Sequence, residues 1–71
     1  MNRLFKNDIK VFRARFNMSQ EELAIKVGVR RETIGNLEKG KYNPSLVLAM
    51  QIAAVFQVKV DDIFQLLDNN E

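Results

Sequence analysis

The stretch "RRETIGNLEKG", residues 30–40, gathers polar side chains that could read the edges of nucleic-acid bases. In a helix that starts near residue 30, Arg31, Glu32, Gly35 and Asn36 lie on one side and the apolar residues lie toward the other. Arginine can bond guanine O6 and N7, asparagine can bond adenine N6 and N7, and glutamate can accept from cytosine N4. A solvated helix surface would carry similar residues, so this face alone leaves both interpretations open.

The elements around this face have the pattern of two short helices joined by a tight turn. Ser19 and Glu22 fit the capping box that opens a helix, and Gly28 is typical of the position just after a helix end. We therefore expect helices over residues 20–27 and 30–38. Two helices in this order, the second with a polar outward face, are typical of a helix-turn-helix.

The rest of the chain also has helical periodicity. Apolar spacing predicts helices over residues 5–16 and 45–56, then a connector over 57–60 and a short last helix that opens with Asp61 and Asp62. No segment is predicted as a strand. The predicted core consists of Ile9, Phe12, Leu23, Ala24, Val27, Ile34, Leu37, Leu46, Ala49, Ile52, Ala53, Phe56 and Ile63. The expected fold is all-α, a compact five-helix bundle that forms one domain over residues 1–71.

Composition narrows the function classes. The chain has no cysteine and no histidine, so thiolate metal sites and the usual general base are missing, and we expect neither an enzyme nor a cofactor. No apolar run reaches the length of about 20 residues that spans a bilayer, so we expect a cytoplasmic protein without a membrane partner. Residues 1–41 hold ten of the eleven basic residues and five of the nine acidic ones, which suits a basic face turned toward a polyanion.

The sequence also resembles the phage-repressor or Cro-like helix-turn-helix regulators, the xenobiotic-response-element family. The matching stretches are "MSQEELA", "GV", "TI", "LEKGKYNPSL", "LA", "IA" and "DDIF", which together extend over nearly the entire chain. The resemblance implies a lambda-repressor-like DNA-binding domain whose helix-turn-helix occupies about residues 19–38. The helix over 20–27 would then be the positioning helix, and the helix over 30–38 would be the recognition helix.

The resemblance also assigns roles to individual residues. It implies that Arg31, Glu32 and Asn36 read bases and that Arg13 and Glu38 form a structural ion pair between helices. Residues implied to lie at the DNA backbone or groove edge are Gln20, Arg30, Thr33, Lys39, Lys41, Tyr42 and Asn43.

Two residues depart from the family pattern. Arg30 replaces the small polar cap, so either its side chain turns to phosphate or the helix begins slightly later. Gly35 removes a side chain from the reading face, so specificity has to rest on Arg31, Glu32 and Asn36.

The expected function is that of a sequence-specific transcriptional regulator of double-stranded DNA, a repressor that binds a near-palindromic operator as a homodimer. The dimerisation region is expected at about residues 47–67, through the surplus apolar side chains Val47, Met50, Val55, Phe64, Leu66 and Leu67. A protein-interaction module such as an antitoxin or adaptor remains the alternative, since the same apolar residues would suit another protein. The sequence identifies neither the operator nor any regulatory partner protein.

Overall fold

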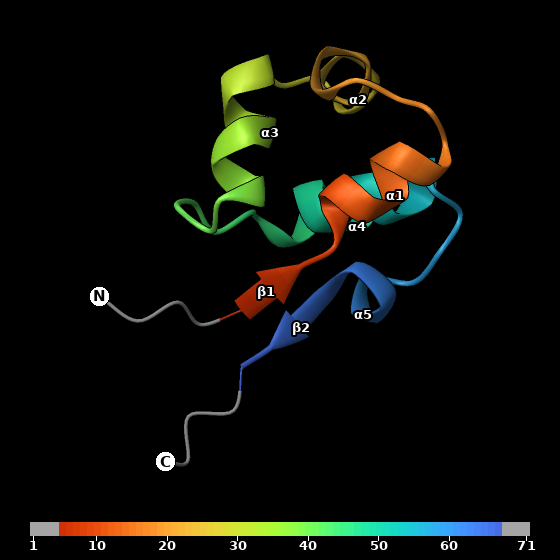
Figure 1. Cartoon of the computed structure of the whole chain (residues 1–71). Helices are drawn as coiled ribbons and strands as arrows, with labels where there is room; N and C mark the ends of the chain where they lie inside the picture. The colour runs from red at the N-terminus through yellow and green to blue at the C-terminus, as the bar shows by residue number, and fades with distance from the viewer. Residues whose placement is uncertain (1–4, 68–71) are drawn as a thin grey trace.

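Five short helices and two three-residue strands make up the structure, a computed structural model in which residues 5–67 are described (Figure 1). In chain order they are β1 (Phe5–Asn7), α1 (Ile9–Arg15), α2 (Gln20–Val27), α3 (Arg31–Glu38), α4 (Leu46–Val55), α5 (Val60–Ile63) and β2 (Phe64–Leu66). The five predicted helices are therefore present, and the prediction that there is no strand is wrong.

The two strands form a small antiparallel ribbon that joins the beginning and the end of the described chain. Phe5 is opposite Leu66 and Asn7 is opposite Phe64 in the register. The rings of Phe5 and Phe64 meet edge to face with centroids 6.0 Å apart. The description all-α is thus only approximate, because β1 replaces the first turn of the helix predicted over 5–16 and β2 replaces the predicted end of the last helix.

Local sequence features explain where α2 begins and ends. The Ser19 hydroxyl accepts from the Glu22 backbone N–H at 3.0 Å, and the Glu22 carboxylate accepts from the Ser19 N–H at 2.8 Å. At the other end Gly28 has φ of 76°, a left-handed conformation that costs glycine no steric penalty. The predicted capping box and the predicted stop at Gly28 are both confirmed.

The observed orientation of helix α4 differs from the prediction at one residue of the core. The helix begins at Leu46 because Ser45 accepts from the Leu48 N–H at 3.0 Å. In this register Leu48 is buried and 6% exposed, whereas Leu46 faces outward and is 72% exposed. Leu48 therefore takes the core position that we had expected for Leu46.

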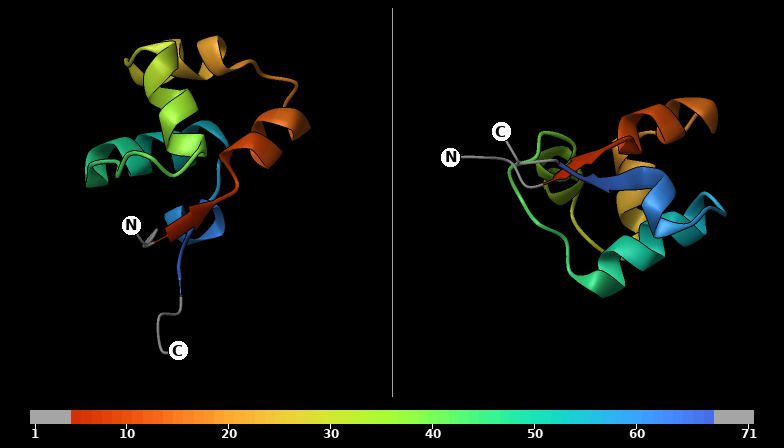
Figure 2. Two further views of the ribbon diagram at one scale, coloured as in Figure 1. Left: turned by 60° about the vertical axis from the view of Figure 1, so that its left-hand side comes forward. Right: turned by 90° about the horizontal axis from the view of Figure 1, so that it is seen from below.

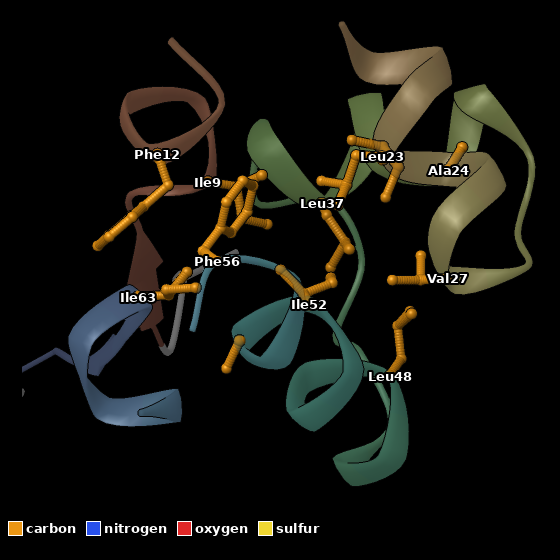
Figure 3. Packing of buried hydrophobic residues seen from close by; sticks show 12 residues of the cluster. Ile9, Phe12, Leu23, Ala24, Val27, Leu37, Leu48, Ile52, Phe56 and Ile63 are labelled. Atoms are coloured by element: carbon orange, nitrogen blue, oxygen red, sulfur yellow. The ribbon is translucent and has the colours of Figure 1, made fainter. Parts of the chain in front are cut away.

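Side chains from all five helices meet in one core (Figure 3). Phe56, which follows α4, is 2% exposed and lies with its ring centroid 5.6 Å from that of Phe12 and 5.2 Å from that of Phe16. The buried apolar residues are Ile9, Phe12, Leu23, Ala24, Val27, Ile34, Leu37, Leu48, Ala49, Ile52, Ala53, Phe56 and Ile63. All predicted core residues other than Leu46 are thus confirmed.

The elements divide the molecule into two ends. Helix α2 and the start of α3 lie at one end and the β1–β2 ribbon lies at the other, with α1, α4 and the last turn of α3 between them (Figure 1 and the left view of Figure 2). Within residues 5–67, no helix has the length and apolar character required to cross a membrane.

Candidate nucleic-acid interface

Helix α3 has a buried side and an outward side. Ile34 and Leu37 are completely buried in the core, so they fix the rotation of the helix about its axis. Arg31, Glu32 and Asn36 are exposed on the outward side. The predicted base-reading residues therefore lie together at the surface, on a helix whose other side is fixed in the core.

The turn before α3 sets the angle at which that surface is presented. After Gly28 the Val29 N–H donates to the Ala24 carbonyl at 3.0 Å, which closes the end of α2. Arg30 has an extended backbone and makes no side-chain cap, so α3 begins at Arg31, one residue later than expected. The exposed Arg30 guanidinium is thereby left at the N-terminal end of α3.

An ion pair joins α1 to the last turn of α3. The Arg13 Nε donates to Glu38 Oε2 at 2.6 Å, and the Arg13 Nη2 donates to Glu38 Oε1 at 3.1 Å. A further bond at 3.0 Å runs from Arg13 Nη1 to the carbonyl of Met18 just before α2. The two side chains are only 14% and 9% exposed, so this fork ties three segments together in a nearly dry environment.

The same carboxylate also orients a residue of α2. Gln20 is the first residue of α2, and its Nε2 donates to Glu38 Oε1 at 3.0 Å. The half-buried Gln20 amide is therefore held alongside α3. Gln20, which the family resemblance implies to meet DNA, is thus held in place by Glu38, which the resemblance implies to be structural.

Most of the remaining predicted contact residues lie in the loop after α3. The N–H of Gly40 donates to the Leu37 carbonyl at 3.0 Å, and the N–H of Lys41 donates to the Asn36 carbonyl at 2.9 Å, so the loop folds back on the helix. The exposed side chains of this loop are Lys39, Lys41, Tyr42 and Asn43, while Thr33 on α3 is half-buried. Lysines thus lie at the C-terminal end of α3 and arginines at its N-terminal end.

Sequence reasoning missed one residue that supports α3 from the ribbon. The Asn7 Nδ2 donates to the Leu37 carbonyl at 2.9 Å, and the Asn7 Oδ1 accepts from the Ile9 N–H at 3.2 Å. An asparagine two residues before a helix is a known turn-forming pattern, which could have located the second bond. The first bond depends on a contact across the fold, which no local pattern reveals.

The side chains expected in the dimer interface are split between two environments. Val47 and Met50 on α4 are 63% and 54% exposed, and Leu66 on β2 is 87% exposed. Val55 and Phe64 instead pack against the core of the same chain, and Leu67 is half-buried. Val55 and Phe64 therefore fit within the domain, whereas Val47, Met50 and Leu66 lie outside its core, and the dimer interface itself stays a prediction.

Comparisons with known proteins agree with the helix-turn-helix arrangement of α2 and α3. A family model described as helix-turn-helix matches residues 9–63. An uncharacterized HTH-type transcriptional regulator of Archaeoglobus fulgidus is 73% identical over 56 residues, which cover 79% of each chain. The uncharacterized HTH-type transcriptional regulator YgzD of Bacillus subtilis is 49% identical over 65 residues, which cover 92% of this chain and 98% of YgzD.

Solved structures give the same result for the fold. The restriction-modification controller protein C.AhdI from Aeromonas hydrophila superposes with a TM-score of 0.71 and 30% identity, over 76% of this chain and 82% of its own. The clp gene regulator ClgR from Corynebacterium glutamicum superposes with a TM-score of 0.72 and 26% identity, over 76% of this chain and 57% of its own.

Proposed function

The chain belongs to the helix-turn-helix family, and we propose that it recognises one double-stranded DNA sequence with α3, as a homodimer, and represses transcription there. The coarser part of this statement follows from the family: the chain is a transcriptional regulator with a DNA-binding helix-turn-helix, and it is not an enzyme. What we propose beyond this is that α3 selects particular bases, that the protein is a homodimer and that it represses transcription.

The observation that carries the proposal is the outward face of α3. Arg31, Glu32 and Asn36 project from a helix whose rotation is fixed by the buried Ile34 and Leu37. A helix with this face fits the major groove, where arginine, glutamate and asparagine distinguish base pairs through hydrogen bonds. We assign these three residues to base reading.

A second set of residues would hold the DNA backbone. Arg30 at one end of α3 and Lys39 and Lys41 at the other are exposed, as phosphate contacts require. Gln20, Thr33, Tyr42 and Asn43 complete the set, with Gln20 in the position that the Glu38 carboxylate gives it. These contacts would set the register of α3 in the groove without reading sequence.

The exposed apolar surface of α4 supports a dimer. Leu46, Val47 and Met50 lie at the N-terminal half of α4, and each is more than half exposed. We propose that a second copy covers this surface, with Leu66 and Leu67 at the margin. A two-fold axis would set the recognition helices roughly 34 Å apart, so the operator would be a near-palindrome with half-sites about 10 base pairs apart.

Repression is the simplest regulatory outcome of such binding. A dimer seated on a promoter excludes other proteins by occupancy, which requires no surface beyond the DNA interface. A reporter with the operator inside its promoter tests this part: expression should fall when the chain is present and recover with Arg31→Ala. Increased expression would make the chain an activator.

Selection of bound sequences from a random duplex pool tests DNA recognition directly. We expect one enriched near-palindrome, with affinity that falls by orders of magnitude between 50 and 200 mM salt. A pool without enrichment would overturn sequence-specific recognition. Binding that is insensitive to salt would favour the protein-interaction alternative.

A further inference from the structure

Gly35 is the one residue of the α3 outward face without a side chain. It lies four residues after Arg31 and directly before Asn36, in the interior of an eight-residue helix. The residue is half-buried, with the Gln20 amide as its neighbour from α2. Its backbone is therefore left without a side chain of its own among the predicted base readers.

Nothing in the fold of the described residues requires glycine here. Gly28 and Gly40 have positive φ, which favours glycine, but Gly35 does not. A Cβ built on Gly35 would lie 3.8 Å from Gln20 Nε2 and 3.9 Å from Gln20 Oε1, which are ordinary van der Waals distances. Alanine would fit this site without strain.

Glycine is nevertheless unfavourable in a helix interior, because it loses more backbone entropy on folding than alanine does. Gly35 weakens the helix, and no steric reason within the described part of the chain accounts for it. A contact with another molecule is therefore the most direct explanation. Gly35 lies on the face that the proposed function turns toward DNA. The close approach of a ligand backbone or base is one of the uses of glycine.

We propose that Gly35 is a specificity-determining residue, the point where the edge of a base pair comes closest to α3. This inference rests on the proposed function, since it presupposes that α3 lies in the major groove. Arg31 and Asn36 are the exposed side chains on the same face as Gly35, so a DNA group that approaches Gly35 belongs to the bases that they read rather than to a distant phosphate. A methyl group at residue 35 would hold the helix away from that edge.

The position of the affected base pair follows from helix geometry. Successive residues rise by about 1.5 Å along the axis, so along the axis Gly35 lies about 1.5 Å from Asn36 and about 6 Å from Arg31. The base preference that Gly35 controls should therefore be at, or next to, the base pair read by Asn36.

The variant Gly35→Ala tests the proposal in three measurements. Its melting temperature should equal or exceed that of the parent, because alanine is the better helix former. Its affinity for the selected operator should fall about tenfold, the size of one good base contact, while its affinity for random duplex stays within about twofold. Repeated selection with the variant should change the preferred base at the position relaxed by Asn36→Ala.

A double variant separates a DNA contact from an effect inside the protein. The built Cβ approaches only Gln20, so alanine at residue 35 could act by displacing that amide. In the Gln20→Ala background there is no amide at residue 20 to displace, so this effect is removed. If Gly35→Ala still lowers operator affinity in the Gln20→Ala background, the result supports close approach of the DNA to Gly35. If the affinity loss disappears in that background, the proposal is overturned.

Failure of this inference is distinguishable from failure of the proposed function. If the parent selects no sequence, the proposed function fails. If the parent selects an operator but Gly35→Ala binds it as tightly, or loses affinity equally for operator and random duplex, only the role of Gly35 is overturned. A lower melting temperature of Gly35→Ala would also overturn it, because the glycine would then serve the fold.

Discussion

The guanidinium of Arg13 binds both carboxylate oxygens of Glu38, at 2.6 and 3.1 Å, across 25 positions of the sequence. Glu38 would otherwise place a negative charge at the C-terminal end of α3, where the helix dipole disfavours it. The ion pair offsets this cost, and it connects α1 to α3, the helix that we propose reads the DNA. Because Glu38 also accepts from Gln20, the pair determines how α2 and α3 present their surfaces.

We expect Glu38→Gln to destabilise the domain by about 2 to 4 kcal/mol, because the Arg13 charge is then left nearly buried without a partner. Urea denaturation followed by circular dichroism measures the loss. The double variant Arg13→Met with Glu38→Leu should lose less than the sum of the two single variants, since no unpaired charge remains. The exposed Glu21→Gln is the matched control, with an expected change below about 1 kcal/mol. Equal losses for Glu38→Gln and Glu21→Gln would show that the pair contributes little.

Two leucines of α4 test the corrected core. Leu48→Ala should cost roughly 2 to 5 kcal/mol, because the removed side chain is buried and leaves a cavity. Leu46→Ala, the same substitution two residues away on the exposed side, should change stability by less than about 0.5 kcal/mol. Thermal melting of the two variants beside the parent gives the comparison, and similar melting temperatures for both would contradict the register of α4.

Loss of a side chain that we propose reads bases should reduce specificity as well as affinity. Arg31→Ala or Asn36→Ala should each lose about 1 to 3 kcal/mol on the selected operator and relax the preference at one position of each half-site. Gel-shift titrations with the operator and with random duplex measure the difference.

Lys41→Ala is the control for that experiment. As a phosphate contact it should weaken binding to every duplex by a similar factor and lower the salt slope by about one unit. If Arg31→Ala behaved in the same way, Arg31 would belong with the backbone contacts.

Charges placed on the exposed surface of α4 should separate the proposed dimer. Val47→Asp with Met50→Asp leaves the core intact, because both side chains point outward. Sedimentation at tens of micromolar should show a dimer for the parent and a monomer for the variant. Operator affinity should fall toward the nonspecific level as one half-site is lost. Phe64 is unsuitable for this test, since it packs against the core of its own chain.

Ile25→Asp is the matched control for the dimer variant. Ile25 on α2 is 71% exposed and apolar, but it lies outside the proposed interface. It should leave the dimer unchanged. A parent that sediments as a monomer, both free and on its operator, would contradict the dimer.

Features that depend on neighbouring residues were predictable from the sequence. The capping box of Ser19 and Glu22 and the stop at Gly28 each involve groups within one helical turn, and both were placed correctly. The rotation of α3 followed from the spacing of Ile34 and Leu37. Because these local rules also orient the outward face, the exposure of the candidate base readers could be inferred before the fold was known.

Features that depend on distant partners could not be predicted in this way. Residues 5–7 continue the apolar periodicity of α1, and only the pairing with residues 64–66 makes them a strand. Leu46 and Leu48 are equally apolar, and the choice between them depends on how α4 turns toward the other helices. The bond from Gln20 to Glu38 likewise requires the packed arrangement of α2 and α3.

The β1–β2 ribbon also has a consequence for the order of folding events. Pairing Phe5 with Leu66 closes a loop that contains nearly the whole domain, so its entropic cost is met only after the helices have packed. A two-stranded ribbon of this length is marginal by itself. The ribbon should therefore form last and open first, and the Asp8 amide, which donates to the Ile63 carbonyl, should exchange its hydrogen faster than amides inside α4. Each opening would separate residues 5–7 from residues 64–66 while Arg13 still holds Glu38, so fraying would start in the ribbon and would cost the last turn of α3 its bond from Asn7.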